Sequence, residues 1–181
     1  KEEEALSDVR DLADLAIDTS RLSVHDLRRR ITDQVAHRRR DQLTITFESF
    51  GYKRGVPLDA DLVFDARCLP NPYWDPALRQ SNGRDAVIQT FLSTYPIVES
   101  MCQDIYDWIV RWLPAYQSSQ RSYMTIAIGC TGGQHRSVYI VEQLAKRMAE
   151  DGIETHIRHR ELGLTYSTAT DAKVADSSTA K

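Results

Sequence analysis

The segment Tyr123–Ile128 constrains the fold more than any other part of the sequence. It is an apolar, partly β-branched run, and the glycine-containing loop 129–137 follows it at once. Apolar residues then recur at helical spacing over residues 138–151, and Gly152 is a typical helix stop. A strand that passes through a glycine loop into a helix is the repeating unit of α/β sheets. We therefore predict an α/β domain that binds its ligand beyond the carboxyl end of this strand.

The remaining apolar patterns predict the neighbours of this unit. Strict alternation and short apolar runs indicate strands, whereas spacings of three and four residues indicate helices. The order β, β, α, α, β, α, β favours a small mixed or mostly parallel sheet flanked by helices. The further elements expected are strands at 43–48 and 62–64, helices at 85–93 and from Pro96 to a stop at Pro114, and a last strand at 153–157.

Three regions are predicted along the chain. Residues 1–41 contain two helical pieces with little core of their own, the second capped by Ser23 with Asp26 three residues on, and are interpreted as a helical remnant of an N-terminal domain or a linker. Residues 42–163 form the predicted α/β domain. Residues 164–181 are rich in Ser, Thr and Ala, which predicts a disordered tail.

Composition excludes several classes of protein. Of 181 residues, 41% are hydrophobic and 27% charged, which rules out a disordered or collagen-like chain. Lys+Arg number 23 against Asp+Glu 26, so a uniformly basic nucleic-acid-binding domain is not supported, although local basic patches remain possible. No apolar run approaches the roughly 20 residues of a membrane helix. Three cysteines without a CxxC pair predict neither a disulfide framework nor a zinc site, and we expect a cytoplasmic protein without a metal.

The loop 129–137 has the composition of an anion site. Its glycines let backbone N–H groups approach a phosphate, and the following helix directs its positive dipole end at the loop. Thr131 and Ser137 can donate hydroxyl hydrogen bonds, Arg136 can form a two-pronged pair with phosphate oxygens, and His135 can switch its charge near neutral pH. The alternative is a tight turn whose polar residues only cap the helix.

The same loop admits a catalytic interpretation. Five residues separate Cys130 from Arg136, a spacing similar to that of cysteine-dependent phosphatases. A thiol that faces a helix N-terminus and an arginine has a lowered pKa and becomes a nucleophile. Asp65 or Asp75 would then be the general acid. Otherwise Cys130 is a small buried residue at a strand end.

Several separate motifs occur in one order along the chain: FESFGYK at 47–53, VFDAR at 63–67, LPNPYWDP at 69–76, RSY at 121–123 and IAIGCTGGQHRSVY at 126–139. Together they resemble the C-terminal half of the RapZ family. These are RNase adapter proteins that are also described as P-loop nucleotide-binding proteins. The resemblance spans roughly residues 18–163.

The resemblance implies different functions for the N-terminal and C-terminal domains of the family. The family's N-terminal domain binds and slowly hydrolyses ATP or GTP, but this sequence contains neither GxxxxGKS nor GxxxxGKT, so no cofactor and no enzymatic activity are expected in this chain. The C-terminal domain of one branch senses glucosamine-6-phosphate and binds a small regulatory RNA, which it presents to an endonuclease. A homo-oligomer with an RNA or a signalling protein as partner is therefore expected. A cysteine phosphatase and an oligomerisation domain remain the alternatives.

The family's functional residues map onto this sequence in three groups. The phosphate and sugar would contact Asp65, Arg67, Cys130, Thr131, Gly132, Gly133, His135, Arg136 and Ser137. The rim of the pocket would comprise Asn71, Tyr73 and Trp74. RNA would contact Lys53, Arg54, Gln134, Arg158, His159 and Arg160. Gln134 stands where the RNA-binding branch has Lys and Tyr73 where it has His, and the strongly basic C-terminal end of that branch is missing.

Overall fold

The chain divides into two compact units, residues 1–40 and 41–181. The computed structural model describes residues 17, 19, 22–24, 26–27, 43–119 and 121–168. In the first unit, Ser23 Oγ accepts the backbone N–H of Asp26 (3.2 Å) and donates to its carboxylate (2.7 Å), which confirms Ser23 as the cap of a helical turn. The rest of the two predicted helical pieces lies outside the described residues.

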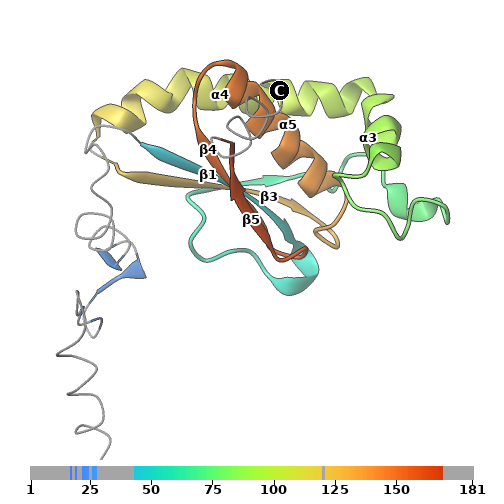
Figure 1. The fold of residues 1–181 in the computed structure, drawn as a ribbon, viewed down its shortest axis with the longest axis horizontal. Helices are drawn as coiled ribbons and strands as arrows, with labels where there is room; N and C mark the ends of the chain where they lie inside the picture. The colour runs from blue at the N-terminus through green and yellow to red at the C-terminus, as the bar shows by residue number, and fades with distance from the viewer. Residues whose placement is uncertain are drawn as a thin grey trace, which may run out of the picture. The chain divides into compact units, whose positions relative to one another are not determined.

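The second unit is an α/β domain, as predicted. Its five strands lie in the order β2-β3-β1-β4-β5, and every pairing is parallel except that of β4 with β5. Among the described residues, three α-helices accompany the sheet (Figure 1). In chain order the elements, with η for 3₁₀ helices, are β1 (Thr44–Gly51), η1 (Tyr52–Arg54), β2 (Leu62–Asp65), η2 (Pro72–Trp74), α3 (Ala86–Ser93), α4 (Pro96–Ser118), β3 (Tyr123–Cys130), α5 (Arg136–Glu150), β4 (Thr155–His159) and β5 (Leu164–Ser167).

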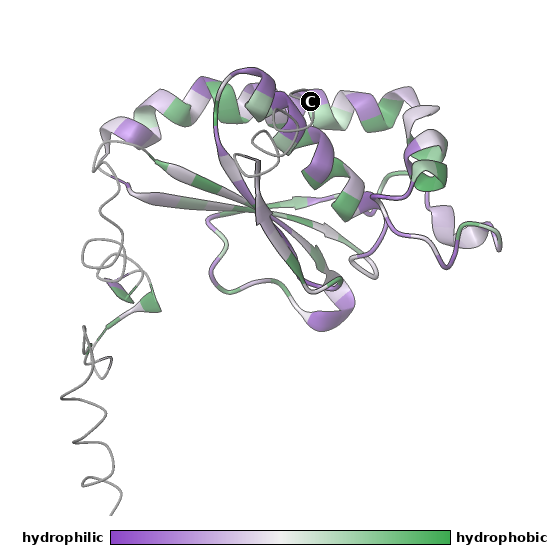
Figure 2. Ribbon diagram, in the orientation of Figure 1, coloured by the Kyte–Doolittle hydropathy of each residue, from purple (hydrophilic) through white to green (hydrophobic). Residues whose placement is uncertain are grey.

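One face of the sheet carries the hydrophobic core. Ile45 and Phe47 of β1 lie beside Met124 and Ile126 of β3, and all four are fully buried. Paired residues of parallel strands project from the same face, so these side chains point together toward the helices. All three helices lie on this side of the sheet in Figure 1. Figure 2 shows hydrophobic and hydrophilic residues alternating along α4 and α5, as expected of helices with one buried side.

The opposite face of the sheet is more polar and is partly covered by the connection from β1 to β2. Glu48 of β1 is ion-paired with Arg158 of β4, and Arg158 also contacts Asp59 of the connection at 3.0 Å. Asp61 accepts the backbone N–H of Thr125 in β3 at 2.8 Å. These contacts fix the later part of the connection against the sheet, while η1 follows directly after the carboxyl end of β1.

Pro114 does not end α4, contrary to the prediction. The helix continues to Ser118 with Pro114 inside it. A proline removes one backbone hydrogen bond, but it lies on the exposed side here, while Leu113 and Tyr116 pack against the core. Burial of those neighbours holds the last turn in place.

The prediction of a disordered tail from residue 164 is wrong for Leu164–Ser167, which form β5. Tyr166 lies opposite Ile157 of β4, packs against the core and donates its hydroxyl hydrogen bond to Glu142. The segment 153–157 is thus not the last strand, and its strand lies two residues later. Residues 169–181 lie outside the described residues. In the described part of the chain, no helix combines the length and apolar character needed to cross a membrane.

Candidate anion site

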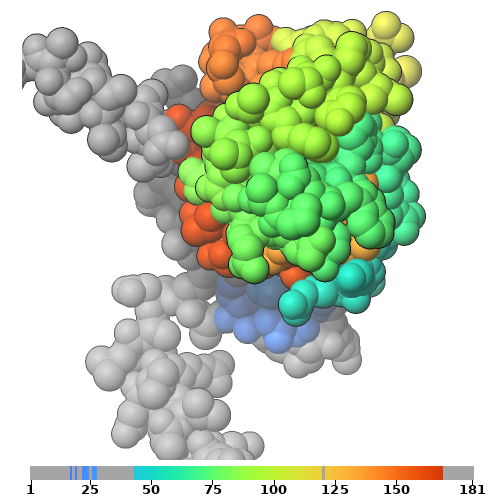
Figure 3. All heavy atoms as spheres, turned by 90° about the vertical axis from the view of Figure 1, so that its right-hand side faces the viewer, coloured from blue at the N-terminus to red at the C-terminus, as the bar shows by residue number. Residues whose placement is uncertain are grey.

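The loop after β3 lies where the carboxyl ends of three parallel strands meet. Gly51 at the end of β1 pairs with Cys130, and Asp65 at the end of β2 pairs with Gly129. The chain then turns through residues 131–135 into α5. Figure 3 looks at this edge of the domain: the green atoms before and within α3 occupy its centre, and cyan atoms near η1 lie beside them. The loop predicted to bind an anion therefore lies at the carboxyl edge of the sheet.

Glycines let the loop pack backbone against backbone. A Cβ on Gly133 would lie 2.5 Å from the backbone nitrogen of Gly51 and still closer to Cγ of Glu161, and the φ of Gly133 is +73°. A Cβ on Gly129 would lie 2.5 Å from the rings of Phe50 and Tyr52. The conformation of Gly133 directs its N–H toward Cys130 Sγ at 3.2 Å. The loop therefore has one tightly fixed shape.

The first turn of α5 has no capping side chain. His135 is the N-cap residue but makes no capping hydrogen bond, and the first turn contains no acidic residue. Backbone N–H groups at a helix start have no partner within the helix, and the helix dipole adds positive potential there. Ser137 lies within this turn and is buried, and its Oγ is 3.2 Å from Cys130 Sγ. This end of α5 suits a negative ligand.

Arg136 points into the domain instead of into solvent. Its side chain is buried, and Nη1 donates to the backbone carbonyls of Arg67 (2.9 Å) and Leu69 (3.0 Å). Nη2 donates to Thr131 Oγ1 at 3.3 Å. Nε is buried without a hydrogen-bond partner among the described residues. Arg136 thus joins the loop after β2 to the loop after β3 and keeps an unused donor.

His135 is less suited to act as a charged donor than predicted. It is buried, and burial lowers its pKa by disfavouring the imidazolium; backbone groups of Ser81 and Leu78 oppose this shift. Nε2 has no hydrogen-bond partner within the described part of the chain. The neighbouring Gln134 carbonyl accepts the N–H of Gly83 at 2.8 Å. Burial therefore favours the neutral form of His135, whose side chain is enclosed beside the segment before α3.

Asp65 and Arg67 form an ion pair at the edge of the site. Both oxygens of Asp65 accept from Arg67, the shortest bond being 2.7 Å, and these bonds hold the pKa of Asp65 below its usual value. The Arg67 guanidinium also stacks on the ring of Tyr52 at 3.8 Å. Both members of the pair remain exposed. An aspartate kept ionised cannot easily donate a proton, so this geometry opposes the role of general acid for Asp65.

The predicted rim residues lie on and beside η2. Asn71 caps this short helix by accepting the N–H of Tyr73 at 3.3 Å. Tyr73 and Trp74 are exposed, and Trp74 is 76% accessible. Arg79 stacks on Tyr73 at 4.8 Å and donates to its carbonyl. The two aromatic rings are thus accessible to a ligand or a partner.

A family model described as the RapZ C-terminal domain matches residues 43–163. The chain belongs to the RapZ C-terminal domain family.

Three similar proteins are each named nucleotide-binding protein. One from Chromohalobacter salexigens is 63% identical over 164 residues, 91% of this chain and 55% of its own length. One from Alcanivorax borkumensis is 53% identical over 161 residues, which are 89% of this chain and 57% of that protein. One from Cellvibrio japonicus is 51% identical over 161 residues, which are 89% of this chain and 54% of that protein. The chain spans about half the length of the curated relatives it matches.

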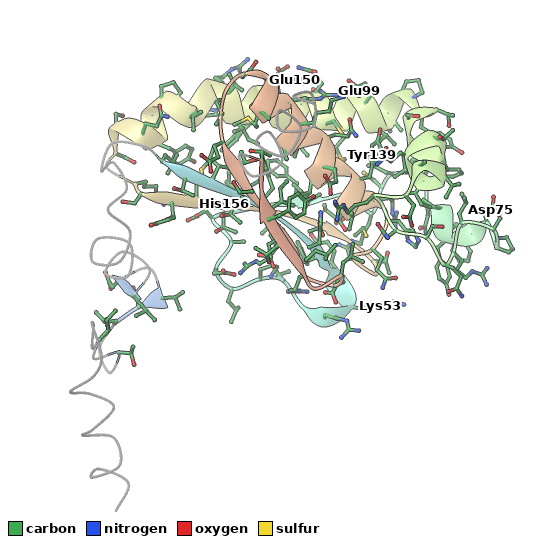
Figure 4. The ribbon with its side chains drawn as sticks, viewed as in Figure 1. Lys53, Asp75, Glu99, Tyr139, Glu150 and His156 are labelled. Atoms are coloured by element: carbon green, nitrogen blue, oxygen red, sulfur yellow. The ribbon has the colours of Figure 1, made fainter. Side chains whose placement is uncertain are left out.

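Most of the cations predicted to contact RNA are paired inside this RapZ C-terminal domain. Arg54 and Arg160 bind Glu161, and Arg158 binds Glu48 and Asp59 as described above. Lys53 and Gln134 are exposed, and Figure 4 shows Lys53 projecting from η1 away from the sheet. Figure 2 shows this turn as strongly hydrophilic.

The prediction that His159 contacts RNA is wrong. Its side chain is fully buried, with Nδ1 2.8 Å from Ser49 Oγ and Nε2 3.1 Å from Glu142. The resemblance assigned it to RNA together with its neighbours Arg158 and Arg160, but it lies at the end of β4 on the core side of the sheet. Both ring nitrogens already have partners inside the protein, so this imidazole offers no free group to an RNA.

Two residues at the site were not identified from the sequence. Tyr52 supports Arg67, and its membership of the FESFGYK motif was the signal that could have revealed it. Glu161 lies beneath Gly133 and binds the backbone N–H of Gly51, which is 110 residues away in the chain. No local pattern marks a contact across that distance.

Proposed function

We propose that this RapZ C-terminal domain binds the phosphate of a phosphorylated amino sugar at the loop 129–137. One observation carries the proposal: a buried guanidinium with an unused Nε donor lies beside a helix start that has no capping side chain. Both features favour an anion, and a buried arginine binds phosphate oxygens with more geometric selectivity than a surface lysine. We propose that the ligand is a glucosamine-6-phosphate-like sugar.

The ion pair of Asp65 and Arg67 supports the sugar part of the proposal. The pair lies at the end of β2, the strand next to β3, and it remains exposed. An ionised carboxylate is a suitable partner for an ammonium substituent or for sugar hydroxyls. The exposed ring of Trp74 offers an apolar surface on the loop that Arg136 holds in place.

The relatives' name leads to a second part of the proposal. We propose that nucleotide binding belongs to the half of those proteins that this chain does not match, since the sequence lacks a phosphate-binding P-loop motif. In the longer protein, this domain would report the sugar phosphate to a regulatory RNA or to a protein partner such as an endonuclease.

Calorimetry of the chain against four solutes tests the ligand: glucosamine-6-phosphate, glucose-6-phosphate, inorganic phosphate and glucosamine. We expect binding to require the phosphate and to be tightest when the ammonium is present as well. Glucosamine alone should give no signal. Equal heats for glucosamine and for its phosphate, or no heat with any phosphate, would contradict the proposal.

The same samples distinguish a sensor from a cysteine phosphatase. The alternative retains one supporting observation, which is that Cys130 Sγ accepts the N–H of Gly133 and so has a donor that would stabilise a thiolate. A phosphatase would release inorganic phosphate, and Cys130→Ser would stop that release. We expect no release from the wild-type chain and nearly unchanged binding in Cys130→Ser.

The RNA partner is tested by retention across a salt series. Lys53 and Arg54 are the exposed cations of the described residues that the proposal assigns to phosphate contacts. Each such contact steepens the loss of affinity with salt, so retention should fall markedly between low and physiological ionic strength. Lys53→Ala should reduce the slope of log affinity against log salt concentration by about one, which corresponds to the loss of one phosphate contact. Absence of a complex at low salt would remove RNA from the proposal for this chain.

A further inference from the structure

We propose that Glu161 is a positioning residue for the anion loop. Its aliphatic part packs behind Gly133, and its carboxylate binds the end of β1 and holds Arg54 beside the loop as a second cation. This inference rests on the proposed function, because it concerns how the same loop is kept ready for a phosphate.

Glu161 is almost completely enclosed by groups of the site. Its side chain is 6% exposed although it lies in the turn between β4 and β5. Oε1 accepts hydrogen bonds from the backbone N–H of Gly51 at 3.3 Å and from Arg160 Nε at 3.1 Å, and Arg160 Nη2 lies 3.0 Å from it as an ion-pair contact. Oε2 forms an ion pair with Arg54 Nε at 2.8 Å. A carboxylate with a partner on each oxygen has one defined position.

The aliphatic part of Glu161 touches the loop itself. Its Cγ occupies the space into which a Cβ on Gly133 would project. Gly133 donates its N–H to Cys130 Sγ, so the orientation of this peptide group depends on what supports it from behind. The backbone of Gly51 lies against Gly132 and Gly133 on the same side. Removing Glu161 would leave a gap behind the turn and free it to move.

The two arginines make a carboxylate acceptable next to an anion site. Arg160 Nη2 also donates to the carbonyls of Gly51 (3.2 Å) and Gly55 (2.8 Å), so this guanidinium is occupied by the protein. Arg54 uses Nε for Glu161, and its side chain is 77% exposed, which leaves its terminal nitrogens accessible. The group of three therefore has a net positive charge, and Arg54 is its more exposed cation.

Three variants test the inference: Glu161→Ala, Glu161→Gln and, as control, Glu99→Ala. The control breaks another arginine–carboxylate pair, that of Glu99 with Arg147 between α4 and α5. Figure 4 shows Glu99 on the helix layer, far from Lys53 on η1. Titration uses inorganic phosphate and glucosamine-6-phosphate. We expect Glu161→Ala to weaken binding about tenfold, as when a group that supports a ligand-binding residue is removed. Glu161→Gln should recover part of the loss because it keeps the volume and the acceptor for Gly51.

A second measurement is independent of any ligand. Amide hydrogen exchange over residues 129–137 should be faster in Glu161→Ala than in the wild type and unchanged in Glu99→Ala. If the wild type binds neither probe, the proposed function fails, while exchange still decides the positioning role. Equal exchange in Glu161→Ala and the wild type overturns the inference. So does tighter phosphate binding by Glu161→Gln, since that result means that Glu161 acts only as a repelling charge.

Discussion

Arg136→Ala is expected to weaken the binding of glucosamine-6-phosphate strongly. The buried guanidinium supplies the proposed charge for the phosphate, and loss of one partner from a buried charge pair costs about 2–5 kcal/mol. Since about 1.4 kcal/mol corresponds to a factor of ten, affinity should fall roughly 30-fold or more. Calorimetry measures this loss directly. Arg136→Lys should recover only a part of the affinity, because an ammonium cannot reproduce the forked geometry.

The same substitution should also lower stability. The carbonyls of Arg67 and Leu69 would lose the donor that joins the loop after β2 to α5. Each buried polar group left without a partner costs about 1–3 kcal/mol. Arg147→Ala is the matched control on the same helix, because it removes contacts with Gln103 and Glu99 at the opposite end of α5. Unchanged sugar-phosphate affinity in Arg136→Ala would contradict the proposal that Arg136 binds the phosphate.

Gly133→Ala should unfold or strongly destabilise the domain, whereas Gly132→Ala should be tolerated. Gly133 has a φ of +73°, and a Cβ there would overlap the backbone nitrogen of Gly51 and Cγ of Glu161. A Cβ on the adjacent Gly132 meets nothing within 4 Å. Strain and overlap together predict a loss of about 2–4 kcal/mol at Gly133. Urea unfolding followed by circular dichroism measures the difference between the two variants.

Comparison of Gly133→Ala with Gly132→Ala distinguishes a loop held in one conformation from a flexible glycine-rich turn. If the loop were a loose turn, both substitutions would have similar small effects, because each removes only backbone freedom of the unfolded chain. A Gly133→Ala variant as stable as Gly132→Ala would therefore contradict the packing described for this turn.

Local patterns were sufficient for the main elements of the fold. Alternation identified β1, the apolar run identified β3, and helical spacing identified α5. Each of these signals lies within a short stretch of chain, where side-chain periodicity directly reflects burial. The loop that we propose to bind an anion was located for the same reason, since its glycines and polar residues all lie between Gly129 and Ser137.

Local patterns failed where a distant contact decides the outcome. β5 has a polar composition, and only its pairing with β4 and the packing of Tyr166 make it a strand. His159 has basic neighbours in the sequence, yet the alternation of β4 turns it inward to Ser49 and Glu142. Continuation of α4 past Pro114 likewise depends on Leu113 and Tyr116 reaching the core.

The sequence by itself determined the α/β class, membership of the RapZ C-terminal domain family and the position of the loop between β3 and α5, because each is written in contiguous residues. The tertiary structure alone decided which charged groups are free. Lys53, Arg158 and Arg160 have equivalent charges in the sequence, but Glu48, Asp59 and Glu161 approach the two arginines only after the strands assemble. Charge is a local property of a residue, whereas its neutralisation depends on which distant side chain the fold brings within bonding distance.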